Sequence, residues 1–165
     1  MTSDTTPTMI DTGAPVISRR SLLIPAPRAA VWAAHADVAR WPEWQSDIST
    51  ASIDGPLAPG SIITWVTKGI SEPIPSTIYA VEAERRTLWG APAMGIDGIH
   101  EWRFTDAKGG TLVETEESWS GAPVDADPAT MQGLLDASLD AWLARLADRL
   151  RAVNPPSNED TTDGR

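Results

Sequence analysis

The chain of 165 residues contains no cysteine, which excludes disulfide bridges, thiolate nucleophiles and cysteine-ligated metal sites. Basic residues are scarce, since 13 lysines and arginines stand against 23 aspartates and glutamates, for a formal charge of −10. That balance disfavours nucleic acid, because binding to it rests on neutralising phosphates with Lys and Arg, and it disfavours anionic membrane surfaces for the same reason. We therefore expect no nucleic-acid partner and no membrane partner.

Long apolar runs are also missing. No stretch approaches the ~18–20 apolar residues of a membrane span, and residues 1–14 lack the basic and apolar segments of a secretory signal. Cytoplasmic localisation is therefore the default expectation. Two histidines without an H-x-x-x-H spacing predict no metal site, and no nucleophile elbow or phosphate loop is present. We expect neither a metal nor another cofactor.

Tryptophan is abundant where the other aromatic residues are rare. The chain has eight tryptophans against one tyrosine and one phenylalanine. A buried tryptophan hides about 150–250 Å² of surface, and one small core does not need eight of them. Three fall in the short stretch VWAAHADVARWPEW, residues 31–44. Some of the indoles are therefore expected to face a space that another molecule fills.

One domain is expected over residues 15–153, between two polar tails at 1–14 and 154–165 that read as disordered. The first ordered piece, PVISRRSLLIPAP, is typical of a strand ended by prolines. Pro27 suits the first turn of a helix that reaches about His35. Asp37 then predicts the cap of a second short helix, and Pro42 limits its continuation.

Residues 48–121 alternate short apolar segments with turn signals such as DGPLAPG and DAKGG. This spacing predicts about five or six antiparallel strands joined by short turns. The last element is a long helix, capped by Asp127, with Pro128 at its first position and an apolar stripe that recurs every three or four residues to about Val153. The fold class predicted is α+β, a curved antiparallel sheet wrapped around a long C-terminal helix with two short helices after the first strand.

Three stretches carry a family resemblance: IPAPRAAVWAAHADVARWPEW, APGSIITWVTKG and GIHEWRFTDAKGGTLVETEESWSG. With the final helix, they resemble the polyketide cyclase/dehydrase branch of the START-like (SRPBCC) superfamily over about residues 16–153. The resemblance implies a helix-grip fold with an internal cavity for a hydrophobic small molecule. It does not choose one activity, because that superfamily contains aromatase/cyclases, ligand carriers and hormone receptors.

Strand alternation assigns side chains to the two faces of the sheet. In IHEWRFT, Glu101 and Arg103 share a face that we expect to be in solvent, so the opposite face points inward. In TLVETEESWSG, the face that carries Val113 and Trp119 is assigned inward. The side chains expected inside on these two strands are His100, Trp102, Phe104, Val113, Thr115, Glu117 and Trp119.

Other residues are placed at the cavity by the resemblance. Trp65 is taken as inward-facing, and Trp89 follows. Trp41 and Trp44 fall on the segment that closes the broad end of the cavity in the resembling family, although packing against the sheet edge is the alternative. Met94, in APAMG, reads as part of a loop at the cavity mouth. Trp32 is expected in the core beneath the first helix.

Glu117 and His100 are the candidate catalytic residues. A carboxyl group that faces an apolar interior has a raised pKa and can act as a general acid or base near neutral pH. Alternatively, Glu117 is structural and is bonded to a helix N-terminus or paired with Arg19 or Arg20. His100 is expected beside Glu117 in a hairpin, or else as a buried histidine satisfied by a backbone carbonyl.

Three further polar residues carry weaker hypotheses. His35 and Asp37 lie close together in the sequence, and exposed capping is the favoured interpretation over a catalytic dyad. Tyr79 either donates a phenolic hydrogen bond or packs. The favoured function is a cyclase, aromatase or dehydratase that acts on a planar hydrophobic substrate, and the alternative is a carrier that binds such a molecule unchanged. The protein is expected to be a monomer or a homodimer.

Overall fold

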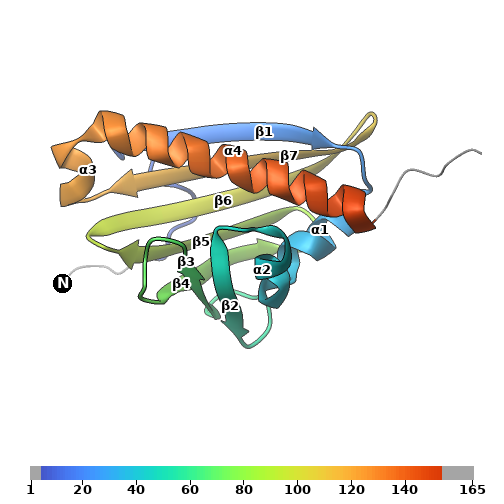
Figure 1. The fold of residues 1–165 in the computed structure, drawn as a ribbon, viewed down its shortest axis with the longest axis horizontal. Helices are drawn as coiled ribbons and strands as arrows, with labels where there is room; N and C mark the ends of the chain where they lie inside the picture. The colour runs from blue at the N-terminus through green and yellow to red at the C-terminus, as the bar shows by residue number, and fades with distance from the viewer. Residues whose placement is uncertain (1–4, 154–165) are drawn as a thin grey trace, which may run out of the picture.

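The computed structural model describes residues 5–153 (Figure 1). Its elements are β1 (Val16–Ile24), α1 (Arg28–Ala36), the 3-10 turn η1 (Val38–Arg40), α2 (Trp41–Trp44), β2 (Ile48–Asp54), β3 (Ile62–Thr67), β4 (Ile74–Glu82), β5 (Arg86–Ala93), β6 (Ile96–Ala107), β7 (Gly110–Ser120), α3 (Ala122–Ala126) and α4 (Pro128–Val153). The tail expected at 154–165 lies outside the described residues, as do residues 1–4. No described helix is both long and apolar enough to cross a bilayer.

The seven strands form one antiparallel sheet in the order β1-β7-β6-β5-β4-β3-β2. α4 runs along one face of this curved sheet, and α1 and α2 close one end (Figure 1). β6 and β7, joined by a tight turn at Lys108 and Gly109, pair along almost their whole length. The predicted α+β helix-grip architecture is confirmed.

The two predicted helix caps have different outcomes. The carboxylate of Asp127 accepts a hydrogen bond from the backbone N–H of Thr130 at 3.2 Å, so α4 begins as predicted. Asp37 caps no helix with its side chain. Its backbone ends α1, and its carboxylate lies 3.5 Å from the guanidinium of Arg40 instead. Asp37 stands at the predicted N-cap position, before η1 and α2, but the predicted side-chain cap was wrong. Pro42 does not end the segment either, because it lies in the first turn of α2, where proline is tolerated.

Residues 5–14, expected to be disordered, pack on the face of the sheet opposite α4. Ile10 is buried, the backbone carbonyl of Thr8 accepts a hydrogen bond from Arg86 on β5, and the N–H of Asp11 donates one to Ser118 on β7. The segment therefore crosses the outer face between these two strands, over β6. Glu101, on that face of β6, is only 2% exposed, and the expectation that it lies in solvent was wrong.

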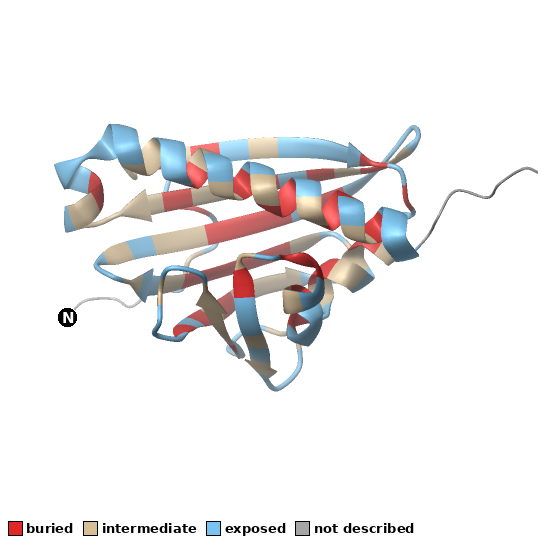
Figure 2. Ribbon diagram, viewed as in Figure 1, coloured by how far each residue is buried: buried red, intermediate tan, exposed pale blue. Residues whose placement is uncertain are grey.

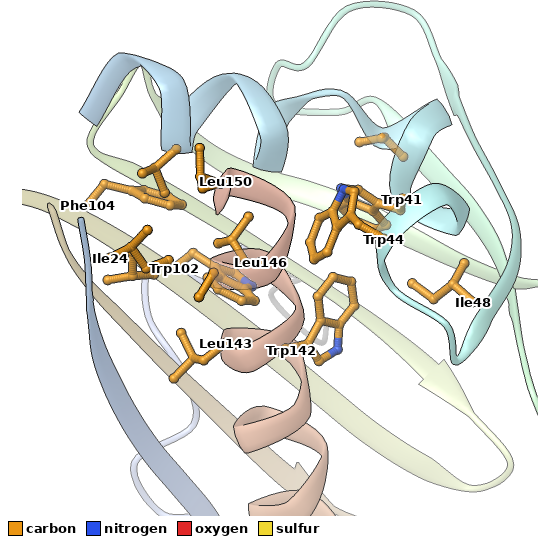
Figure 3. Packing of buried hydrophobic residues seen from close by; sticks show 14 of the residues in the cluster. Ile24, Trp41, Trp44, Ile48, Trp102, Phe104, Trp142, Leu143, Leu146 and Leu150 are labelled. Atoms are coloured by element: carbon orange, nitrogen blue, oxygen red, sulfur yellow. The ribbon is translucent and has the colours of Figure 1, made fainter. Parts of the chain in front are cut away.

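Buried residues, coloured red in Figure 2, recur along the strands of the sheet and along α4. Most belong to a core under α1, α2 and the C-terminal half of α4, where the indole rings of Trp41 and Trp142 meet edge to face at 5.3 Å (Figure 3). Trp32 packs against this core, as predicted, with its ring edge-on to Phe104 at 5.5 Å. A second, smaller core lies near the start of α4, around Leu135.

Candidate functional site

A cavity of about 610 Å³ lies between α4 and the inner face of the sheet. Strands β2 to β7 and α2 contribute to its walls, and α4 covers it with the short side chains of Ala137, Ser138 and Ala141 between Leu134 and Trp142. Its apolar lining consists of Trp41, Ile48, Trp65, Ile70, Ile74, Trp89, Ala91, Ala93, Met94, Ile96, Trp119, Leu134, Ala137, Ala141 and Trp142. A volume in the range of ~300–1,000 Å³ with apolar walls and few polar groups is typical of small-molecule sites.

Most residues singled out from the sequence meet at this cavity. The lining includes Trp41, Trp65, Trp89, Met94, His100, Glu117 and Trp119. Met94 lies at the tip of the β5–β6 turn, where it has a positive φ of 53° and is 71% exposed. Because an exposed apolar side chain at such a position contacts little of the protein, Met94 forms part of the rim rather than a wall.

Trp102, Trp44 and Thr115 do not line the cavity, so these three expectations were wrong. Trp102 is fully buried, because the ring of Trp142 from α4 lies 5.7 Å from it and fills the space above β6 (Figure 3). Trp44 packs edge-on against Trp142 at 5.7 Å and belongs to the core. Thr115 is buried beneath His100, to which it is hydrogen-bonded.

Glu117 and His100 face each other directly across β6 and β7, where they are register partners. Glu117 Oε2 lies 3.5 Å from His100 Nδ1, and Glu117 Oε1 accepts a hydrogen bond from the indole N–H of Trp119 at 2.8 Å. Burial raises the pKa of Glu117 to about 7, against the opposing effect of the Trp119 hydrogen bond. A carboxyl group in this state can give or take a proton near neutral pH.

The proposed pairing of Glu117 with an arginine was wrong. On the outer face of the sheet, Arg19 is bonded to Glu116 at 3.0 Å. Arg20 lies on the inner face of β1, where it is bonded to Asp140 of α4 at 2.9 Å instead of Glu117. No guanidinium therefore offsets the cost of ionising Glu117. This is the reason that desolvation decides its pKa.

His100 is neutral in the folded protein, because burial and the nearby His35 lower its pKa to about 3. Its Nε2 is 2.7 Å from the hydroxyl oxygen of Thr115, and that hydroxyl donates to the backbone carbonyl of Glu101 at 3.1 Å. The alternative interpretation, in which a backbone carbonyl bonds directly to His100, is therefore not what the structure has. The hydroxyl group of Thr115 lies between the His100 ring and the carbonyl of Glu101.

His35 is fully buried rather than exposed, so the expectation of exposed capping was wrong. Its Nε2 lies 2.9 Å from the hydroxyl oxygen of Thr87, and its ring stacks on Trp89 at 5.6 Å. Burial lowers its pKa to about 3. The inner side of α1 packs on β5 and β6, which places His35 in the core and separates it from Asp37.

Sequence reasoning missed the residues that make room for a ligand. Ala137 and Ala141 on α4 and Ala91 on β5 line the cavity with minimal side chains. Gly98 lines it too, and a Cβ there would lie 3.4 Å from both Glu117 Oε1 and Trp119 Cδ1. A glycine inside a strand was the available signal, since it often marks a close approach.

Polar groups other than Glu117 and His100 are few in the lining. Ser76 on β4 accepts a hydrogen bond from the indole N–H of Trp65 at 2.9 Å. Asp47 is half-buried and paired with Arg145, and Lys68 is exposed. Tyr79 packs close to Gly90, where its ring leaves no room for a Cβ. Among residues 5–153, no three His, Asp or Glu side chains are placed to hold a metal ion.

Comparisons with known proteins agree with this architecture. No curated protein matches the chain. Among solved structures, a START superfamily protein from Mycobacterium smegmatis is 11% identical over 83% of this chain and 98% of its own, with a TM-score of 0.69. DynU16, from the dynemicin biosynthetic locus, is 23% identical with a TM-score of 0.68, and the di-domain ARO/CYC BexL from the BE-7585A biosynthetic pathway is 16% identical with a TM-score of 0.67.

The two biosynthetic-pathway proteins are longer than this chain. The similarity covers 84% of this chain but 48% of DynU16, and 83% of this chain but 51% of BexL. At these identities the structural likeness establishes the fold alone. Residues 16–151, however, match the family described as polyketide cyclase / dehydrase and lipid transport. The chain therefore belongs to the polyketide cyclase/dehydrase and lipid transport family and has its START-like fold.

Proposed function

We propose that this protein binds a planar hydrophobic molecule in the cavity and catalyses its cyclisation and dehydration by acid–base chemistry. The observation that carries the proposal is the Glu117–His100 pair, whose Oε2 and Nδ1 atoms lie 3.5 Å apart on the wall of a mostly apolar cavity. A protein that only stores an apolar molecule gains nothing from burying a carboxyl group without a cation, because that burial costs free energy whenever the group ionises.

The walls suit a flat ligand. Trp65, Trp89 and Trp119 come from three different strands, and all contribute ring surface to the same cavity. Aromatic rings stack or meet edge to face with a gain of about 0.5–1.5 kcal/mol per pair beyond their buried area. The substrate class that fits is therefore an aromatic or polyene-like molecule with a hydroxyl and a carbonyl group.

Dehydration of such a substrate needs one acid and one base. The hydrogen on the carbon beside the carbonyl moves to His100 Nδ1, while the proton of Glu117 moves to the departing hydroxyl group. The C–O bond breaks, a C=C bond forms and water leaves. Ring closure by aldol addition uses the same two transfers, with the Glu117 proton passing to the carbonyl oxygen that becomes the hydroxyl group.

Either reaction leaves a protonated His100 beside an ionised Glu117. A single proton transfer from Nδ1 to Oε2 restores the neutral pair, so no proton has to enter from solvent. His100 is a weak base beside a neutral Glu117 and a stronger one once Glu117 has ionised, because an adjacent negative charge favours the imidazolium. Donation of the Glu117 proton therefore favours proton uptake by His100, and the reverse also holds.

A carrier function is the second candidate. The description of the family includes lipid transport, and exposed Met94 and Leu134 give the cavity an apolar rim. In this case the bound molecule would leave unchanged, and Glu117 would only fix its orientation through a hydrogen bond.

Native mass spectrometry separates the two functions. The purified protein is incubated with a metabolite extract of its own host, and the bound species are identified. A species one water lighter than its precursor, formed with wild type but not with Glu117→Gln, supports the enzyme. The matched control is Glu116→Gln, which removes the neighbouring outward-facing carboxylate bonded to Arg19. The same unchanged molecule on wild type and Glu117→Gln would overturn the enzymatic proposal in favour of a carrier.

A further inference from the structure

A row of polar contacts leads from the cavity wall into the sheet. It begins at Glu117, passes through the ring of His100 and the hydroxyl group of Thr115, and ends at the backbone carbonyl of Glu101. His100, Thr115 and Glu101 are all at least 95% buried. Because water does not reach the His100 ring or the Thr115 hydroxyl group, their hydrogen bonds must come from within the protein.

The direction of the bonds follows from counting protons. A threonine hydroxyl group has one proton to donate and two lone pairs that accept. The Thr115 proton is directed to the carbonyl oxygen of Glu101, at 3.1 Å. With its proton directed there, Thr115 accepts at the 2.7 Å contact with His100, and this arrangement requires the hydrogen of the ring to be on Nε2.

The other ring nitrogen is then fixed as well. Neutral imidazole has one N–H and one bare nitrogen, and Nδ1, with its lone pair, is left facing Glu117 Oε2. A lone pair repels an ionised carboxylate and accepts a hydrogen bond from a protonated carboxyl group. The arrangement therefore favours a proton on Glu117.

We propose that Thr115 is a positioning residue, which holds His100 as the Nε2–H tautomer and thereby keeps the proton shared by the pair on Glu117 Oε2. Thr115 does not touch the cavity and acts only through His100. The effect of Thr115 on turnover rests on the proposed function, whereas its effect on the His100 tautomer and on the protonation of Glu117 does not.

The outer face holds the end of this row in place. The carboxylate of Glu101 is bonded to Arg86 at 2.9 Å and lies 2.6 Å from the guanidinium of Arg103. Arg86 also donates to the carbonyl of Thr8 in the N-terminal segment. The residue whose carbonyl receives the Thr115 proton is thus fixed on the side of the sheet away from the cavity.

Few other charges act on Glu117. Its register partner on β1 is Ser18, whose hydroxyl group donates to Asp136 of α4 at 2.6 Å. His100 faces it from β6, and the charged residues that share its cavity are Asp47 and Lys68 near the opening. The wall of α4 above the cavity consists of Leu134, Ala137, Ser138, Ala141 and Trp142. His100 is therefore the titratable group in contact with Glu117.

The test is nuclear magnetic resonance of the ligand-free protein, with the two histidine rings labelled with ¹⁵N and the glutamate carboxyl groups with ¹³C. Long-range ¹H–¹⁵N spectra show which ring nitrogen carries the hydrogen. In wild type we expect Nε2–H for His100, and a carboxyl group that titrates near pH 7 and is lost in Glu117→Gln. Thr87→Ser, which alters the partner of His35, assigns the two rings.

Thr115→Val is the decisive variant, because valine keeps the shape of threonine but cannot accept a hydrogen bond. We expect His100 to change to the Nδ1–H tautomer, which donates to Glu117 and lowers the Glu117 midpoint by about one pH unit or more. Thr115→Ser, which keeps the hydroxyl group, should restore both signals. The alkaline limb of the pH–rate profile, along which Glu117 loses the proton that it donates, should shift to lower pH by the same amount wherever turnover is measured.

Two results would overturn the proposal. One is an Nδ1–H tautomer of His100 in the wild type, and the other is an unchanged Glu117 midpoint in folded Thr115→Val. A failure of the proposed function looks different. In that case the tautomer and the midpoint respond as expected, while Glu117→Gln and wild type leave the bound molecule equally unchanged.

Discussion

The two histidines of this chain lie in the same kind of environment and have different neighbours. Both are buried, both have Nε2 within 2.9 Å of a threonine hydroxyl oxygen, and burial lowers the pKa of each to about 3. His35 is enclosed by Trp89, Trp102 and Phe104. His100 instead borders the cavity and faces Glu117.

The comparison shows that burial alone does not indicate a catalytic histidine. Desolvation has the same effect on both rings, so a lowered pKa cannot distinguish them. What differs is the partner of Nδ1 and the access to a space for a ligand. Perturbed titration is therefore informative here for the pair Glu117–His100, in which the two pKa values move in opposite directions, rather than for either histidine separately.

The largest expected effect is acid destabilisation. A histidine with a folded pKa near 3 and an unfolded value near 6.5 contributes stability that is complete above pH 6.5 and is lost as the pH falls toward 3. The upper limit is about 5 kcal/mol for each ring. Urea unfolding between pH 7 and pH 4 measures the slope, and His35→Gln, which does not titrate, should reduce it. An equal slope in both proteins would contradict the low pKa of His35.

The next largest effect is the loss of unfolding free energy at pH 7.5 when the ring of His35 or of His100 is removed. His35→Ala leaves a void among aromatic rings and an unpaired Thr87 hydroxyl group, so we expect a loss of about 2–4 kcal/mol in unfolding free energy. His100→Ala only enlarges an existing cavity, where water can reach Thr115, and should cost about 1–2 kcal/mol. Urea titration gives both values. A loss from His100→Ala that matches or exceeds that of His35→Ala would mean that His100 is mainly a core residue.

The contrast between His35 and His100 also shows which features of the site could be predicted from the sequence alone. The period of the strands assigned His100, Glu117 and Trp119 to the correct face, and the apolar stripe with its cap located α4. Trp65 and Trp89 were placed by the family resemblance instead. These signals are local. Alternation places a side chain on one side of a sheet but does not say whether a helix lies directly above it.

This distinction explains the errors at Trp102 and His35. The ring of Trp142, which is 40 positions away in the sequence from Trp102, converts a possible cavity wall into core. His35 lies on a nine-residue helix, where too few turns exist to define a buried face by periodicity. The packing of residues 5–14 on the outer face rests on Ile10 and two long-range hydrogen bonds, for which the local sequence carries no pattern.

Glu117 should make a smaller contribution to the pH dependence of stability, opposite in sign to that of the two histidines. Its folded pKa of about 7 exceeds the reference value of 4.5, so its contribution to stability is complete below pH 4.5 and is lost as the pH rises through 7. Glu117→Gln should therefore be more stable than wild type at pH 8, by at most about 3 kcal/mol, and nearly equal to it at pH 4. Thermal unfolding at the two pH values measures this. Destabilisation at pH 8 would show that ionised Glu117 has a favourable partner.

Substitution of Trp119 should change stability least and ligand binding most clearly. Trp119 lines the cavity whereas Trp102 lies in the core, so Trp119→Phe should remove much of the fluorescence quenching caused by a planar probe such as 2-naphthol. Trp102→Phe should retain that quenching but lose more stability, because a phenyl ring leaves a void beside Trp142. Titration of each variant with 2-naphthol, with urea unfolding alongside, compares them. Quenching lost only in Trp102→Phe would place the ligand on the other side of Trp142, within the aromatic core, and would reverse the assignment of cavity and core.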